Sequence, residues 1–185
     1  MAKRRVLILG GARSGKSRYA QRLAHEIGGR VLFVATAEAL DGEMERRISE
    51  HRRRRPAGWR TLEAPLRVGR RIQSALEDAE VVLVDCSTLL VSNVLGERSS
   101  SEAGDIDEAL AEAAVDAEIR ALLDVVRDSG ASFLIVSNEV GSGLVPENRL
   151  GRLYRDLLGK ANQSLAEAMD EVYLMVAGLP LRLKP

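Results

Sequence analysis

Short apolar runs alternate along this chain with longer segments in which apolar positions recur every three or four residues. The runs are rich in Val, Leu and Ile and predict strands at 6–9, 31–35, 81–85, 133–137 and 172–176. The segments between them predict helices near 16–28, 41–54, 66–78, 106–128 and 147–169. Nearly continuous apolar strands that alternate with helices are typical of βαβ units, in which a parallel sheet is buried on both faces.

The end of the chain has a different pattern. After the predicted strand 172–176, Gly178 precedes a second apolar segment, which indicates a hairpin and an antiparallel edge strand. Pro180 is compatible with that assignment, since proline is tolerated at a sheet edge. We therefore predict an α/β fold with a mostly parallel central sheet flanked by helices and a C-terminal antiparallel edge hairpin. The length of 185 residues favours a single domain over residues 1–185.

The composition indicates what kind of protein this is and in which compartment we expect it. Hydrophobic residues make up 45% and charged residues 29% of the chain, as in an ordinary globular protein. No apolar run approaches the length of about 20 residues that a membrane-spanning helix needs. The first residues lead directly into the first predicted strand with no leader-like pattern, and the lone Cys86 has no internal disulfide partner. We expect a cytoplasmic protein without a membrane span.

The net charge of zero conceals a strong asymmetry. The first 71 residues carry a large excess of Lys and Arg, and the remainder carries an equal excess of Asp and Glu. A basic N-terminal part suits an anionic ligand. The arginine run 52–55 could form a nucleic-acid patch, but no aromatic residues interleave with it. A phosphate clamp or a solvated helix end is the better interpretation, so we expect no nucleic-acid partner.

The most specific motif follows the first predicted strand. Residues 10–17, called the phosphate-binding loop below, have the pattern G-x-x-x-x-G-K-S between an apolar run and a helix-like segment. In that context the backbone N–H groups and the helix N-terminus form an anion site. The lysine adds charge for the β- and γ-phosphates, and the serine hydroxyl can bind Mg²⁺. This pattern predicts a nucleoside triphosphate site made by Gly10, Gly11, Ala12, Arg13, Ser14, Gly15, Lys16 and Ser17.

A carboxylate stands where the third predicted strand ends. The run 81–84 is wholly apolar and is followed by Asp85. In proteins with a phosphate-binding loop, an aspartate at such a strand end completes the Mg²⁺ shell directly or through water. Many buried strands end in Asp, so the signal is weak alone and gains weight from the loop. We predict that Ser17 and Asp85 hold the metal.

His51 is the strongest candidate for a nucleophile. On a helix over 41–54 it lies along the stripe formed by Leu40, Met44 and Ile48, and the arginine run follows it at once. Nearby positive charge favours the neutral imidazole, which can attack phosphorus. A packed histidine or a helix C-terminal cation would explain the same position, and position alone favours these structural interpretations.

Two further features leave alternatives open. Glu63 could accept hydrogen bonds from a guanine edge or a ribose, although the pattern alone favours a surface carboxylate. The segment 138–143 follows a predicted strand at the sheet edge that carries the phosphate-binding loop, and it contains two glycines. It is interpreted as an active-site loop or as a simple turn.

Taken together, these segments resemble the bifunctional adenosylcobinamide kinase/adenosylcobinamide-phosphate guanylyltransferase family of cobalamin assembly. The resemblance covers nearly the whole chain. It rests on the phosphate-binding loop and on an ordered set of shorter motifs: Ala35-Thr36-Ala37, His51 to Pro56, Trp59-Arg60-Thr61-Leu62-Glu63, Val84-Asp85 with Leu89 and Asn93, Asn138-Glu139-Val140-Gly141, and Gly151-Arg152-Leu153-Tyr154-Arg155-Asp156. This ordered set is far more specific than the loop alone.

The resemblance implies an enzyme with two reactions. A nucleoside triphosphate (ATP or GTP) phosphorylates adenosylcobinamide, and GTP then transfers GMP to adenosylcobinamide phosphate, giving adenosylcobinamide-GDP and pyrophosphate. The histidine at position 51 is implied to become guanylylated, which reverses the structural interpretation of His51. A RecA-like P-loop fold and a homotrimer are also implied. The residues implied to contact GTP are those of the loop 10–17 with Ala35, Thr36, Ala37, Arg52, Arg53, Arg54, Arg55, Glu63 and Asp85.

The arginine run is denser than the family pattern requires, so the sequence leaves open which of its members contacts phosphate. Two rival functions remain at this point. One is a kinase with a single activity toward a small hydroxyl substrate, and the other is a nucleotide-dependent switch or nucleic-acid-binding protein that uses the arginine run.

Overall fold

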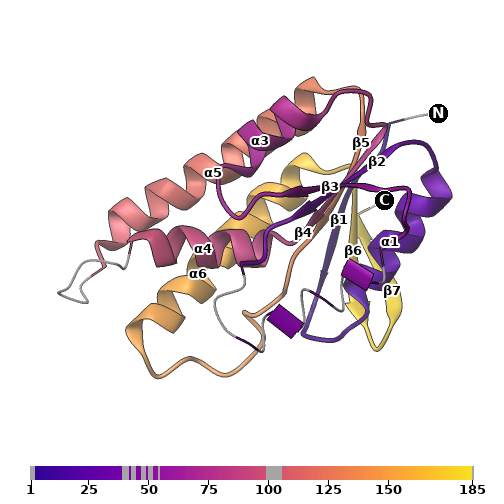
Figure 1. Ribbon diagram of the computed structural model, residues 1–185. Helices are drawn as coiled ribbons and strands as arrows, with labels where there is room; N and C mark the ends of the chain where they lie inside the picture. The colour runs from indigo at the N-terminus through magenta and orange to yellow at the C-terminus, as the bar shows by residue number, and fades with distance from the viewer. Residues whose placement is uncertain are drawn as a thin grey trace.

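A computed structural model describes residues 3–38, 42, 45–46, 49, 52–53, 55–98 and 106–184. Over these ranges seven strands form one sheet in the order β3-β2-β4-β5-β1-β6-β7, with helices packed against both faces (Figure 1). The strands are β1 (Arg5–Gly10), β2 (Val31–Ala35), β3 (Arg60–Glu63), β4 (Val81–Asp85), β5 (Ser132–Val136), β6 (Glu171–Val176) and β7 (Leu179–Lys184). The helices are α1 (Lys16–Ile27), α3 (Val68–Ala75), α4 (Ser87–Arg98), α5 (Glu108–Asp128) and α6 (Arg149–Ala168).

Two apolar clusters lie on opposite faces of the sheet. Alternate strand residues such as Leu7 and Val84 face the cluster formed with α3, α4, α5 and α6. Their neighbours Ile8 and Leu83 face the cluster formed with α1. Figure 1 shows the corresponding layers, with α1 on one side of the sheet and α3, α4, α5 and α6 on the other side. Because both faces are covered, the central strands are apolar at every position, as the sequence indicates.

The first six strands in chain order pair in parallel, and β7 pairs with β6 in the antiparallel direction. The connection from β6 to β7 is Ala177 and Gly178, whose φ angles of 51° and 85° are those of a tight hairpin turn. Pro180 lies in the outermost strand, where its missing N–H costs no ladder bond. The predicted α/β fold, the mostly parallel sheet and the antiparallel edge hairpin are all confirmed.

The predicted helices and strands agree closely with those of the structure, but one strand and one helix were not predicted. All five predicted strands are present, and four of the predicted helices correspond to α1, α3, α5 and α6. The predicted helix over 41–54 falls mostly outside the described residues. The sequence reading missed β3, in which Leu62 is the one large apolar residue, and α4, whose apolar residues surround much of the helix. Neither element has the clean periodicity that marks the others.

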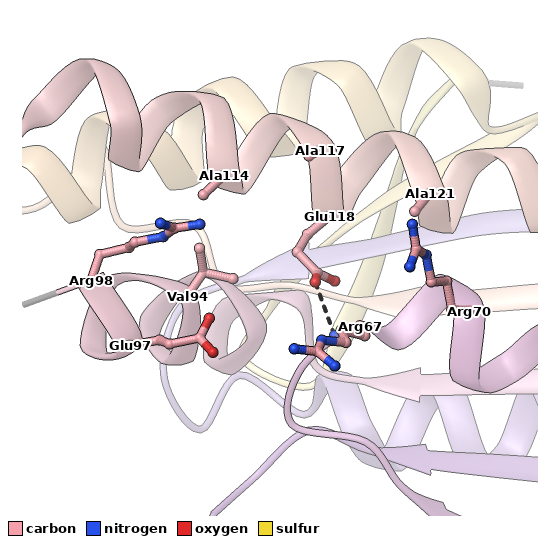
Figure 2. Close-up of a pocket in the computed structure, with 9 residues that line it drawn as sticks. All are labelled: Arg67, Arg70, Val94, Glu97, Arg98, Ala114, Ala117, Glu118 and Ala121. Carbon is pink, nitrogen blue, oxygen red and sulfur yellow. Dashed lines mark hydrogen bonds between the residues drawn. The ribbon is translucent and has the colours of Figure 1, made fainter.

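Helix α3 begins without a capping side chain of its own. Its N-cap residue Arg67 has a φ of 54°. The backbone N–H groups of Arg67 and Val68 have no partner within the helix and donate to the Glu118 carboxylate, at 2.9 and 3.3 Å. Figure 2 shows Glu118 reaching down from α5 to this helix start. A carboxylate at a helix N-terminus is stabilising because it meets the positive end of the helix dipole. This contact therefore fixes α3 against α5.

No helix in the described part of the chain combines the length and the apolar character that crossing a membrane would require.

An ion pair joins Arg4, the residue before β1, to Glu171, the first residue of β6. The Arg4 guanidinium donates twice to the Glu171 carboxylate, from Nε at 2.7 Å and from Nη2 at 2.8 Å, and the Tyr173 hydroxyl donates to the same carboxylate at 2.8 Å. The Glu171 side chain is 13% exposed. The hydrogen bonds from Arg4 are the main reason that the pKa of Glu171 lies below its ordinary value of 4.5.

We expect Glu171→Gln to lower the free energy of unfolding by about 1–3 kcal/mol at neutral pH, because it removes a charged hydrogen-bond acceptor. Since folding depresses the carboxyl pKa, this stabilisation is present above pH 4.5 and is lost as the pH falls through the folded-state pKa. Urea titrations of both proteins between pH 3 and 7 test this. Asp124→Asn, in the exposed pair with Arg127, is the control and should change nothing measurable. A constant difference between wild type and Glu171→Gln at all pH values would contradict the assignment.

Candidate functional site

The phosphate-binding loop runs from the end of β1 to the start of α1. Gly10 has a φ of 150°, and a Cβ there would lie 2.6 Å from the Met175 carbonyl oxygen and 2.7 Å from Ser14 Oγ. Gly15 has a φ of 96°, and a Cβ there would lie 3.2 Å from Gly178 Cα. Both positions therefore require glycine, for conformation and for space. The loop is tightly held between its own helix and the C-terminal hairpin.

Lys16 is the first residue of α1 and is 7% exposed. Its ammonium donates to the Gly11 carbonyl within the loop at 2.6 Å. Burial lowers the pKa of Lys16, and the nearby Asp85 carboxylate acts in the opposite direction. A lysine ammonium has three donors, so phosphate oxygens of a ligand could take the remaining two. The side chain is positioned for the role that the motif predicts.

A cavity of about 350 Å³ opens beside this loop, at the carboxyl edge of the parallel strands. Its walls come from the loop, from the ends of β2, β4 and β5, and from segments next to them. The lining residues are Ala12, Arg13, Lys16, Ser17, Phe33, Ala35, Ala37, Arg55, Glu63, Asp85, Cys86, Thr88, Leu89, Val136 and Asn138. Nine residues predicted to bind nucleotide are therefore brought together in one cavity, although they are spread over more than 70 positions of sequence.

The predicted metal ligands Ser17 and Asp85 both line this cavity. Among the residues that the structure describes, no group of three or more His, Cys, Asp or Glu side chains could hold a metal by itself. One carboxylate and one hydroxyl beside a phosphate site fit Mg²⁺, which keeps several waters and takes its other ligands from the phosphates. The two residues thus fit a metal that arrives with a nucleotide.

Thr36 has a different position from its neighbours. Ala35 and Ala37 line the cavity, whereas Thr36 is fully buried. Its hydroxyl donates to the Cys86 carbonyl at 2.7 Å and accepts from the Cys86 N–H at 2.8 Å. Asn93 of α4 donates to the Thr36 carbonyl at 2.8 Å. These bonds hold the end of β2 against the end of β4, and a contact between Thr36 and nucleotide stays a prediction.

Arg55 and Glu63 form the opposite wall of the cavity. The Arg55 side chain is 9% exposed, and its guanidinium carbon lies 3.9 Å from the centre of the Phe33 ring. Nη1 of Arg55 is 4.0 Å from the Glu63 carboxylate. Burial lowers the pKa of Arg55, which Glu63 partly offsets. Cation–π contact and a nearby carboxylate together compensate for the desolvated charge.

The other arginines of the run differ from Arg55. Arg52 is exposed and donates to Glu63 at 2.9 Å, and it lines a neighbouring hollow of about 280 Å³ with Trp59 and Thr61. Arg53 is exposed and lines neither cavity. His51 and Arg54 lie outside the described residues. Phosphate contact by each of these residues stays a prediction, and the described geometry brings Arg55 nearest to the loop's cavity.

Five lining residues were not predicted as site residues: Phe33, Cys86, Thr88, Leu89 and Val136. Phe33 and Val136 belong to strands that the sequence located, but their apolar character indicated core. Asn138 begins the segment 138–143, for which the sequence left an active-site loop and a simple turn open, and it lines the cavity at the same sheet edge as the loop. Cys86 follows β4 directly, and Thr88 and Leu89 belong to the missed helix α4.

A second hollow, of about 530 Å³, lies between α3, α4 and α5 (Figure 2). The hollow is lined by the arginines Arg67, Arg70 and Arg98, by Glu97 and Glu118, and by three alanines of α5. It shares no lining residue with the cavity beside the phosphate-binding loop. The sequence reading assigned no function to these residues. Among its lining residues, Glu118 is engaged at the start of α3.

The parallel α/β sheet, the glycine-dependent loop at its carboxyl edge and the buried Lys16 define a protein of the P-loop nucleotide-binding class. Comparison with known proteins narrows this class. The sequence profile of the cobinamide kinase / cobinamide phosphate guanyltransferase family (CobU) matches residues 6–183. The chain belongs to this family and is an enzyme of its kinase and guanylyltransferase type.

Full-length relatives agree with this assignment. The bifunctional adenosylcobalamin biosynthesis protein CobP of Pseudomonas aeruginosa is 48% identical over 180 residues, which is 97% of each chain. The bifunctional adenosylcobalamin biosynthesis proteins CobU of Escherichia coli K12 and of Salmonella typhimurium are each 42% identical, over 97% of this chain and 99% of theirs. The family resemblance inferred from the motifs is confirmed.

Cys86 offers a chemical probe of the cavity. Burial raises the pKa of its thiol to about 11, and the adjacent Asp85 carboxylate acts in the same direction. Since the thiolate is the reactive form, its population at pH 8 should be about a hundredfold below that of a thiol with the ordinary pKa of 9.0.

We expect iodoacetamide to alkylate Cys86 slowly at pH 8 and progressively faster up to about pH 11, and we expect GTP with Mg²⁺ to protect it. Mass spectrometry of the modified peptide over time measures both effects, with glutathione as the reference thiol. Alkylation at pH 8 as fast as that of glutathione would contradict the raised pKa. Absence of protection by nucleotide would contradict the location of the ligand in this cavity.

Proposed function

We propose that this protein catalyses two consecutive transfers to a corrinoid. In the first, the aminopropanol hydroxyl of adenosylcobinamide attacks the γ-phosphorus of ATP or GTP, and the nucleoside diphosphate leaves. In the second, GMP passes from GTP to adenosylcobinamide phosphate, giving adenosylcobinamide-GDP and pyrophosphate. The observation that carries this proposal is one cavity lined by Lys16, Ser17, Asp85, Arg55 and Glu63 in a chain of this family.

The loop side of the cavity supports the handling of phosphate in both transfers. Backbone N–H groups of the loop 10–17 and the ammonium of Lys16 would bind the β- and γ-phosphates. Ser17 and Asp85 would hold Mg²⁺, which supplies neutralisation of charge on the phosphates. Phosphoryl transfer depends mainly on positioning and electrostatic stabilisation, and the fixed loop provides both.

The second transfer needs a nucleophile that is not part of the loop. We assign His51, whose imidazole nitrogen would attack the α-phosphorus of GTP and release pyrophosphate. The phosphate of adenosylcobinamide phosphate would then attack the same phosphorus and free the histidine. A covalent intermediate divides one difficult displacement into two easier ones. Support comes from the motif position of His51 and from the family.

The wall that carries Arg55 and Glu63 supports recognition of the remainder of GTP. Glu63 would accept hydrogen bonds from the guanine edge or the ribose, and Arg55 would contact phosphate. Ala35, Thr36 and Ala37 would contact the nucleotide near the end of β2, and Arg52, Arg53 and Arg54 of the arginine run would contact GTP as well. Further parts of the proposal are a single domain over 1–185, a cytoplasmic homotrimer, and no nucleic-acid partner.

Labelling with GTP that carries ³²P at the α-phosphate tests the covalent step. We expect acid-labile, alkali-stable label on the wild-type protein and none on His51→Ala. His25→Ala is the matched control, because His25 is the other of the two histidines in the chain and is exposed on α1. Label that persists in His51→Ala would exclude this histidine as the acceptor.

Lys16→Ala tests the phosphate site, and His51→Ala distinguishes the proposed function from the two rival functions. We expect both transfers to fall by about a hundredfold or more, because a preorganised charge on the phosphates is lost. His51→Ala should retain phosphorylation of adenosylcobinamide, measured by chromatography of the corrinoid product. A kinase with a single activity would show phosphorylation without any protein label. A nucleic-acid-binding protein would instead show oligonucleotide affinity that falls steeply with salt.

A further inference from the structure

The strand order of the sheet places the segment after β5 next to the phosphate-binding loop. β5 lies between β4, which ends at Asp85, and β1, which leads into the phosphate-binding loop. The backbone beyond β5 continues along β1, since Ser137 N–H donates to the Ile8 carbonyl at 3.0 Å and Glu139 N–H donates to the Gly10 carbonyl at 3.0 Å. Asn138 therefore lies between the loop and the predicted metal ligand.

Asn138 is fixed at both ends of its backbone by side chains from two helices. Its N–H donates to Thr88 Oγ1 of α4 at 2.6 Å, and its carbonyl accepts from Asn162 Nδ2 of α6 at 3.0 Å. Asn162 is 6% exposed and accepts in turn from the buried Ser137 hydroxyl at 2.6 Å. A satisfied buried network of this kind holds its members rigidly.

The side-chain amide of Asn138 is not used by this network. It makes no hydrogen bond to any residue that the structure describes, while Asn138 lines the same cavity as Lys16 and Asp85. A rigid backbone with an uncommitted donor beside a phosphate site is the arrangement of a preorganised ligand contact. An amide also adds no charge that would compete with Lys16 or with the metal.

We propose that the Asn138 amide donates a hydrogen bond to the terminal phosphate of a bound nucleoside triphosphate and thereby distinguishes triphosphate from diphosphate. This inference rests on the proposed function, because it places the γ-phosphate between the loop and Asp85. In the kinase reaction the contact positions the phosphoryl group that is transferred. In the guanylyl reaction it holds the terminal phosphate of the pyrophosphate that leaves.

Calorimetric titration of GTP and of GDP, each with Mg²⁺, tests the contact, with every protein carrying His51→Ala so that guanylyl transfer adds nothing to the heat of binding. We expect Asn138→Ala to weaken GTP binding about tenfold to a hundredfold, the usual effect of losing a hydrogen bond to a charged group. GDP binding should change less than threefold. Asn138→Asp, which has nearly the same shape, should weaken GTP binding further because a carboxylate faces the phosphate. Gln163→Ala, which removes an exposed amide from α6, is the control and should leave both affinities unchanged.

Asn162→Ala examines the positioning network separately. It should lower the preference for GTP over GDP without removing it, while circular dichroism confirms that each variant is folded. If Asn138→Ala and Asn138→Asp retain the wild-type preference for GTP, the Asn138 contact is wrong and the proposed function stands. If the wild-type protein binds neither nucleotide, the proposed function is wrong and the contact with it.

Discussion

Everything at the candidate site depends on three adjacent parallel strands, β4, β5 and β1, that are buried on both faces. A parallel strand in the middle of a sheet has no freedom to slide, because a shift of one residue would turn its apolar side chains to the wrong face and break the backbone ladder. The register Asp85 with Val136, and Ile8 with Val136, is therefore fixed by the core. Asp85, Asn138 and Gly10 come to one edge as a consequence of packing.

The C-terminal hairpin gives this edge its second constraint. β6 pairs with β1 so that Met175 lies opposite Gly10, and the Gly178 N–H donates to the Ser14 carbonyl at 2.9 Å. The last strands of the chain thus hold the loop formed by its first residues. On the outer side, Tyr173 of β6 packs against Tyr19 of α1 with ring centres 5.4 Å apart. The loop is therefore held from both sides, by its own helix and by the hairpin.

Sequence patterns predicted most of this architecture because strong periodicity and burial coincide in the central strands. They failed for β3 and α4, which have weak patterns and owe their structure to pairing with β2 and to packing inside the larger apolar cluster. The site was predicted where one motif specifies backbone geometry, as in residues 10–17, and where a strand visibly ends in a carboxylate, as at Asp85. Asn138 was included in a candidate active-site loop, but its place between loop and carboxylate could not be predicted, because it follows from strand order, which a single sequence does not state.

The two walls of the cavity differ in how they are held, and the proposed chemistry differs in the same way. The loop wall belongs to the centre of the sheet, where β1 pairs with β5 and β6, so the phosphates would be held in a constant position. The opposite wall belongs to β2 and the edge strand β3, and the connection between these two strands carries His51 and the arginine run. In the proposed function, the nucleophile for the γ-phosphoryl group comes from the substrate, whereas the first nucleophile for GMP comes from the protein. The proposal thus assigns the protein nucleophile to the connection between β2 and β3, and the binding of the β- and γ-phosphates to the loop that follows β1.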